Sequence, residues 1–233
     1  MNINKINKNI AAKNSRNPRP FATFFDISES TSKAMAEVSS LSVSDETLVT
    51  LKNNQIINMV TAVEVYFRDI LDAIFKMCER ESFEGKLKKL HDKNYKIDEV
   101  IAIYENKIHP LELISTSLGF QNTDNINKVF STLLGDRFIP NLLKLKWKLA
   151  KDSDEEASKL YMSDVENLQE LFDIRHHLIH NPHKMSTIPD EKIEVLFESM
   201  YGFILASDFA FTEFINANSK SVEIKDREPV LVK

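Results

Sequence analysis

The sequence is poor in the residues that break helices and in the residue that forms disulfides. Its 233 residues include four glycines, seven prolines and one cysteine. So few glycines and prolines mean few tight turns, and they favour long helices. The single cysteine, Cys78, excludes an internal disulfide and a cluster of thiolate metal ligands within one chain. No apolar run approaches the roughly 20 residues needed to span a bilayer, so we expect no membrane-spanning segment.

Acidic residues are absent from the first 25 positions, which carry five lysines and arginines and many asparagines. This composition, with the helix breakers Pro18 and Pro20, predicts a disordered basic arm over residues 1–25. The arm is either a solvated tail or a segment that helps to hold RNA or a partner. The same stretch lacks the apolar region of a secretory signal, so we expect a cytoplasmic protein.

The remaining composition is that of a globular protein, with 42% hydrophobic and 28% charged residues. The net charge of -5 argues against nucleic-acid binding over the whole surface, but it allows a local basic cleft. The length is enough to bury one good core. We therefore predict a single all-α domain over residues 26–218, followed by a tail over residues 219–233.

Apolar residues recur at helical spacing in several segments, and no convincing strand alternation is found. A long helix is expected from about residue 45 to 80, with Ser44 as its N-cap. Ser163 and Glu166 have the spacing of a capping box before another helix. Further helices are expected over residues 82–90, 97–104, 110–118, 126–134, 138–149 and 165–180, and a last helix is expected to start at 189–191. Gly119 and Gly135 mark the ends of the helices at 110–118 and 126–134.

Residues 175–183 hold one arginine and four of the six histidines of the chain. Arg175 falls on the apolar stripe of the helix predicted at 165–180, three residues after Phe172. A cation on a face that packs is costly unless it is paired or lies at an interface. On a helical wheel, His176 and His180 are i,i+4 neighbours that can border one cleft with Arg175, while His177 points away.

Four interpretations of this stretch follow from the residues alone. In the first, the histidines complement the negative helix end and a buried acid holds Arg175. In the second, His176 and His180 bind a metal, with His183 as a third ligand. The third is a nucleophilic enzyme, although no suitable serine or cysteine is adjacent. In the fourth, a histidine moves a proton while the arginine stabilises a charged phosphorus centre.

The R-x4-H spacing from Arg175 to His180, with the polar His176 directly after the arginine, resembles the HEPN superfamily. This is the higher-eukaryote and prokaryote nucleotide-binding domain, here in its bacterial toxin and phage-defence form. The resemblance covers about residues 40–217. It rests on the motif helix, on VEVYFRDIL in the early long helix, on the middle section from HPLELISTSLGF to STLLG, and on the aromatic-rich last helix. It implies a HEPN-like up-and-down helical bundle with extra short helices.

The resemblance also implies an activity, a metal-independent endoribonuclease that uses the RNA 2′-hydroxyl as nucleophile and needs no cofactor. Arg175 would bind the scissile phosphate, His180 would act as general acid or base, and His176 would support them. By analogy of position, Glu64 would orient Arg175, and Asn181 is a further supporting residue. Histidine suits this work because it titrates near neutral pH.

The family further implies a homodimer with a composite cleft, an RNA substrate, and an antitoxin or regulatory partner. HEPN toxins paired with a nucleotidyltransferase antitoxin continue the motif as H-x-Y, and this chain departs from that pattern because Pro182 stands at the tyrosine position. A non-catalytic HEPN module that binds nucleotide or RNA, or mediates dimerisation, is the alternative. A helical scaffold with surface histidines is a third interpretation.

Basic residues elsewhere could guide RNA by charge, with Trp147 stacking on bases. The same lysines also fit the solvated faces of helices. The residues concerned are Lys86, Lys88, Lys89, Lys144, Lys146 and Lys148.

Overall fold

The computed structural model describes residues 2–16, 18–39, 43–91, 94–148, 157–181, 187–219 and 230–231. Within these ranges the chain is almost entirely helical, which confirms the all-α prediction. The helices are α1 (Ile3–Asn14), α2 (Pro20–Ser39), α3 (Asp45–Met77), η1 (Arg80–Ser82), α4 (Glu84–Leu90), α5 (Ile97–Glu105), α6 (Pro110–Ser117), α7 (Thr123–Leu134), α8 (Phe138–Leu142), α9 (Met162–His180) and α10 (Asp190–Asn218). The strands are β1 (Lys146–Lys148), β2 (Ser158–Lys159) and β3 (Val230–Leu231).

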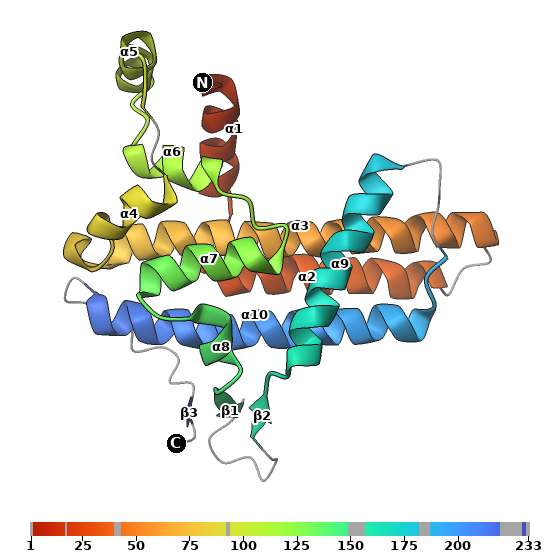
Figure 1. Ribbon diagram of the computed structural model, residues 1–233. Coiled ribbons are helices and arrows are strands. Elements are labelled where there is room, and N and C mark those ends of the chain that lie inside the picture. Colours follow the sequence, from red (N-terminus) through yellow and green to blue (C-terminus); the bar gives the residue numbers. More distant parts are fainter. Residues whose placement is uncertain are drawn as a thin grey trace.

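Three long helices, α2, α3 and α10, form a layer, and α9 crosses this layer diagonally (Figure 1). Helices α7 and α8 lie on the same side as α9 in that view, whereas α1, α5 and α6 project from one edge. Helix α9 packs against both α3 and α10. The crossing therefore brings residues of α3 and α9, more than a hundred positions apart in sequence, into one place.

The core at the centre of the layer is aromatic. The ring of Phe67 on α3 lies 5.1 Å from Tyr66 and 5.4 Å from Phe130, measured between centroids. The same ring is 6.3 Å from Phe203 and 6.4 Å from Phe211, both on α10. Tilted and edge-on pairs at such distances add to the free energy gained by burial. This cluster fixes α3 against α7 and α10, and so fixes the surface that α9 crosses.

Several predicted helix boundaries are confirmed. Helix α3 begins after Ser44, whose Oγ accepts a hydrogen bond from Thr47 N at 3.3 Å. It runs without a break through residues 53–54. Pro110 occupies the first turn of α6, and Gly135 ends α7 at a φ of 83°. Helix α9 ends at His180 as expected.

Other caps differ from the prediction. The side chain of Asn122 caps α7 by accepting from Asn125 N at 2.7 Å, so this helix begins at Thr123 and not at the expected residue 126. At α9, Tyr161 precedes the helix and Asp164 Oδ2 accepts from its backbone N–H at 2.8 Å. The box predicted from Ser163 and Glu166 is therefore shifted by two residues.

The disordered arm predicted over residues 1–25 is wrong for the described residues, because they form α1 and the start of α2. Ion pairs hold α1 in place: the Lys13 ammonium contacts both Asp72 and Glu112, and the Arg16 guanidinium contacts Asp69 through two nitrogens. Ile6 adds a small apolar contact with Ile108 and Leu113. Pro20 starts α2, because proline is well suited to the first turn of a helix.

The helix predicted at 138–149 is also wrong. Helix α8 ends at Leu142, and Lys146–Lys148 forms strand β1 between β2 and β3 of a small antiparallel sheet. Trp147 pairs with Ser158 and with Leu231 in the register of that sheet. The alternation of lysine and tryptophan is what a strand with one buried face requires. Most of the predicted tail over residues 219–233 lies outside the described residues. The described part of this tail consists of Ser219 and strand β3.

Helix α10 is long and apolar enough, by length and composition alone, to cross a membrane, as no other described helix is. Half of its most apolar stretch is buried inside the structure, as in the core helix of a soluble protein. The property is therefore weak grounds for a membrane span, and the expected absence of such a span stays a prediction.

Candidate active site

Helix α9 presents its apolar face to the core and carries Arg175 on the same face. Leu171, Phe172 and Leu178 are all buried on that face. Arg175 lies three residues after Phe172 and three before Leu178, so its side chain is drawn into the packed region and is only 19% exposed. A half-buried guanidinium needs polar partners, and these come from two other segments of the chain.

The partners of Arg175 are a loop amide and a helix carboxylate. Its Nη1 donates a hydrogen bond to Oε1 of Gln121, which precedes α7, at 3.1 Å. Its Nη2 lies 3.8 Å from Oε1 of Glu64 on α3. Its Nε is buried and has no hydrogen-bond partner. One of the three guanidinium nitrogens therefore makes a hydrogen bond, and a second lies within ion-pair distance of Glu64 Oε1, a buried oxygen that has no hydrogen-bond partner of its own among the described residues.

Glu64 serves two arginines. Its carboxylate is 8% exposed, and its Oε2 lies 3.5 Å from Nη2 of Arg68, one turn further along α3. Arg68 is more open to solvent, at 39% exposure. Two guanidinium groups around one carboxylate leave a formal charge of about +1 at the crossing of α3 and α9. Such a site favours an approaching anion.

His176 and His180 share one face of the last turns of α9, as the wheel indicates. Both side chains are exposed, and their ring centroids are 4.3 Å apart at a tilt of 49°. His177 is engaged elsewhere, since Asn181 Nδ2 lies 3.4 Å from its Nδ1 and donates to its backbone oxygen at 3.2 Å. The amide of Asn181 is thus directed to His177 on the preceding turn. Arg175 and His180 are about 7.5 Å apart along the helix axis.

The structure can be compared with the other interpretations of this stretch. The described residues contain no group of three or more His, Cys, Asp or Glu side chains that could hold a metal ion. Pro182 and His183, the proposed third ligand, lie outside the described residues. Cys78 is fully buried at the end of α3, where a substrate cannot reach its thiol. The buried Glu64 beside Arg175 fits both the structural and the acid–base interpretation.

The predicted RNA-guiding residues are not gathered at this site. Trp147 is 4% exposed and packs 6.0 Å from the ring of Phe209, so it cannot stack on a base. Lys146 pairs with Lys159, which precedes the start of α9, whereas His180 is at the other end of that helix. A helix of this length separates its two ends by roughly 27 Å. Lys144 and Lys148 belong to the same region as Lys146.

Lys86 is also occupied, because its ammonium donates to Leu133 O at 2.7 Å and lies over the Phe214 ring. Lys88 and Lys89 follow it on α4. The basic character of the candidate site therefore rests on Arg68 and Arg175.

Sequence reasoning missed two members of the cluster. Arg68 lies four residues after Glu64 on one helix, and that spacing alone indicates an ordinary surface pair. Its proximity to Arg175 depends on the crossing angle of two helices, which local spacing does not report. Gln121 carries no signal of its own, since it lies in a short connection between α6 and α7.

No family model, no curated protein and no solved structure matches this chain.

Proposed function

We propose that this protein is a metal-independent endoribonuclease of the HEPN type that acts in a toxin or phage-defence system. The observation that carries the proposal is the largely buried Arg175, which contacts Gln121 and Glu64 and lies on the same helix as a solvent-facing histidine pair, directly before His176 and five residues before His180. An arginine with a net positive environment binds phosphate, and paired histidines move protons.

The reaction that these groups support is an internal transfer at phosphorus. One histidine, His180, takes the proton from the 2′-hydroxyl of the RNA, and the resulting oxygen attacks the adjacent phosphate. Arg175 stabilises the charge that develops on the phosphoryl oxygens. The bond to the 5′-oxygen breaks, and a second histidine returns a proton to that oxygen. The products are a 2′,3′-cyclic phosphate and a free 5′-hydroxyl.

Glu64 has a positioning role in this scheme. A carboxylate shared by two arginines orients Arg175, yet it neutralises only half of the positive charge. Arg68 is the more exposed of the two arginines, so its side chain is free to move and contact a phosphate that enters the site. The His176 ring lies 4.3 Å from the His180 ring at a tilt of 49° and restricts the rotamers open to it.

A homodimer would complete the cleft, because a single protomer exposes this histidine pair on an open surface. Ile179, which is 40% exposed, lies between the site residues on the outer side of α9. An exposed apolar side chain beside a polar site is what a second copy would cover. An antitoxin or regulatory partner, acting in the cytoplasm, would hold the nuclease silent until it is needed.

The test is cleavage of a 5′-labelled structured RNA in the presence of EDTA. Wild type is compared with Arg175→Ala and His180→Ala, and His177→Ala is a matched control on the same helix. We expect loss of at least about a hundredfold in rate for the first two variants and none for the control, because a general acid or base contributes about that much. Product ends should carry the cyclic phosphate.

Full activity of His180→Ala would remove that residue from the mechanism. Absence of cleavage by wild type on several RNAs, with circular dichroism showing intact helices, would favour the second candidate function. That candidate is a non-catalytic module that binds nucleotide or RNA, or mediates dimerisation. The net positive charge that Arg68 and Arg175 carry around one carboxylate also favours this binding module. Filter binding of RNA to wild type and to Arg175→Ala would then measure that binding directly.

A further inference from the structure

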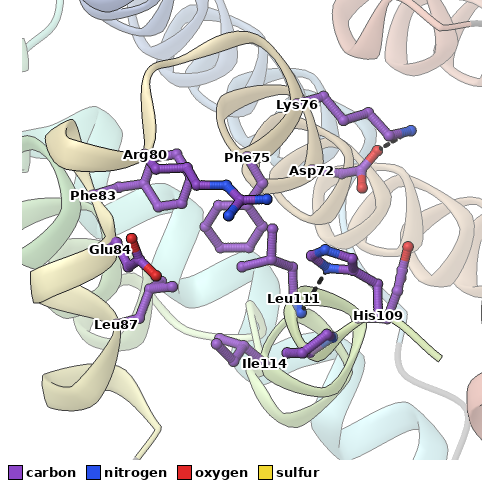
Figure 2. A pocket seen from close by; sticks show the side chains of 12 residues that line it. Asp72, Phe75, Lys76, Arg80, Phe83, Glu84, Leu87, His109, Leu111 and Ile114 are labelled. Carbon is purple, nitrogen blue, oxygen red and sulfur yellow. Dashed lines mark hydrogen bonds and ion pairs between the residues drawn. The ribbon is translucent and has the colours of Figure 1, made fainter. Parts of the chain in front are cut away.

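A cavity of about 500 Å³ lies where the end of α3 meets α4 and the start of α6. None of its lining residues belongs to the Glu64 cluster or to the histidine pair. Figure 2 shows the side chains that enclose it, which come from α3, η1, α4 and α6. Its volume is within the range of small-molecule sites. The cavity is therefore a candidate ligand site separate from the Glu64 cluster.

The inner wall of the cavity is apolar. The Phe75 and Phe83 rings lie 5.2 Å apart between centroids and are almost fully buried. Leu87 closes the α4 side, and Leu111 and Ile114 close the α6 side. Such a wall accepts a branched aliphatic or aromatic group, which gains free energy in proportion to the apolar area that leaves water.

Most of the charge around the cavity is already compensated. Asp72 pairs with Lys13 at 2.9 Å and with Lys76 at 2.8 Å. Glu112 pairs with the same Lys13 ammonium. These residues form a closed ion-pair group and do not call for a charged ligand.

Two opposite charges that line the cavity, on Arg80 and Glu84, remain uncompensated. Within the described ranges, neither the Arg80 guanidinium nor the Glu84 carboxylate makes an ion pair or a side-chain hydrogen bond. Both line the cavity and lie four residues apart in sequence, Arg80 in η1 and Glu84 in α4 (Figure 2). One cation and one anion that line an apolar pocket are complementary to a molecule that carries both charges.

His109 adds a directed donor. Its Nδ1 accepts a hydrogen bond from Leu111 N at 3.2 Å, so the neutral ring carries its proton on Nε2. Figure 2 shows the His109 ring and the Arg80 guanidinium entering the cavity from different elements, near the Phe75 ring. A carboxylate between them would receive an N–H from each side, and charge-assisted bonds of this kind are the strong ones.

From this arrangement we infer that the cavity binds a free α-amino acid with a large apolar side chain. Arg80 and His109 hold the carboxylate, Glu84 holds the ammonium group, and the side chain packs on Phe75 and Phe83. The inference is independent of the proposed ribonuclease activity, because it uses none of the same residues.

Isothermal titration of the full-length protein with free phenylalanine tests the inference. The two matched probes are 3-phenylpropionate, which lacks the ammonium group, and 2-phenylethylamine, which lacks the carboxylate. We expect saturable binding of phenylalanine and at least about tenfold weaker binding of each probe, since each leaves one charge of the protein unpaired. Arg80→Gln and Glu84→Gln should each weaken phenylalanine by about tenfold.

Glu81→Gln is the control, because this exposed carboxylate lies in η1 but does not line the cavity. It should leave the affinity unchanged. A dissociation constant weaker than about 10 mM for phenylalanine overturns the inference. So does binding of 3-phenylpropionate as tightly as phenylalanine, or an affinity that is the same in Arg80→Gln and wild type. Circular dichroism of each variant verifies that the helices are retained.

Discussion

Replacing Glu64 with glutamine tests the arrangement at the crossing of α3 and α9 without changing side-chain volume. The substitution removes the one carboxylate that Arg68 and Arg175 contact in the described part of the chain. Two guanidinium groups then face each other with no anion between them. We expect the free energy of unfolding to fall by about 3 kcal/mol.

The magnitude follows from the distances and the exposure of the groups. Charges 3.5 and 3.8 Å apart attract by about 4 kcal/mol per pair at an effective dielectric constant of about 20. Solvent screens Arg68, which is 39% exposed, so its pair with Glu64 contributes far less. The buried pair with Arg175 dominates, and breaking one partner of such a pair costs about 3 to 5 kcal/mol. We therefore expect a loss of unfolding free energy at the lower end of this range, about 3 kcal/mol.

Urea unfolding followed by circular dichroism measures this change. Glu170→Gln is the control: it breaks an exposed pair with Lys192 and should cost at most about 0.5 kcal/mol. The double variant Glu64→Gln with Arg175→Gln should recover at least half of the loss, because it removes the unpaired cation as well. If Glu64→Gln costs no more than Glu170→Gln, the carboxylate does not hold the arginines and the reasoning fails.

Two further predictions concern other parts of the fold. Gly135→Ala should destabilise the protein by about 1 kcal/mol, because φ is 83° at this position. Gly119→Ala is the control and should cost less, because an added Cβ there meets open space. Thermal unfolding compares the two variants, and equal losses of stability would contradict the prediction. Burial, and then Asp208, raises the pKa of Tyr66 well above 10.0. The unfolded chain then loses that proton first, so unfolding free energy should decline as pH rises above about 10, and less steeply in Tyr66→Phe; identical alkaline slopes would refute it.

Long helices were predictable because their apolar periodicity and their ends agree. In α3, Ser44 caps a pattern that continues to Phe75, and the structure follows it without a break. In α10, acids at the start precede a long apolar face. Where propensity, pattern and capping all indicate the same element, the packing has nothing to override.

The missed elements depend on partners distant in sequence. Helix α2 has few local signals, but Phe24 packs 6.1 Å from the Tyr66 ring and is fully buried. Strand β1 was mistaken for helix because its segment is too short for either period to be decisive. The strand conformation depends on the packing of Trp147 against Phe209, which lies sixty-two residues later in the sequence.

The candidate site was predictable in part. Arg175, His176 and His180 lie on one helix, so their relation follows from helical geometry alone. The position of Glu64 was indicated only by analogy. Arg68 and Gln121 enter the cluster because α9 crosses α3 beside the connection to α7, and no single-sequence pattern reports that crossing.

Helix α1 is attached to the rest of the molecule chiefly by charge. Lys13 and Arg16 contact three carboxylates, whereas the apolar contact is limited to a small cluster around Ile6. Ionic screening shortens from about 10 Å at 0.1 M salt to about 3 Å at 1 M, while the aromatic core is indifferent to it. The paired side chains are only 9% to 23% exposed, however, so salt screens these contacts in part only. Neutralising the three carboxylates, rather than raising the salt concentration, is therefore the change that would release this helix while the long helices stay packed.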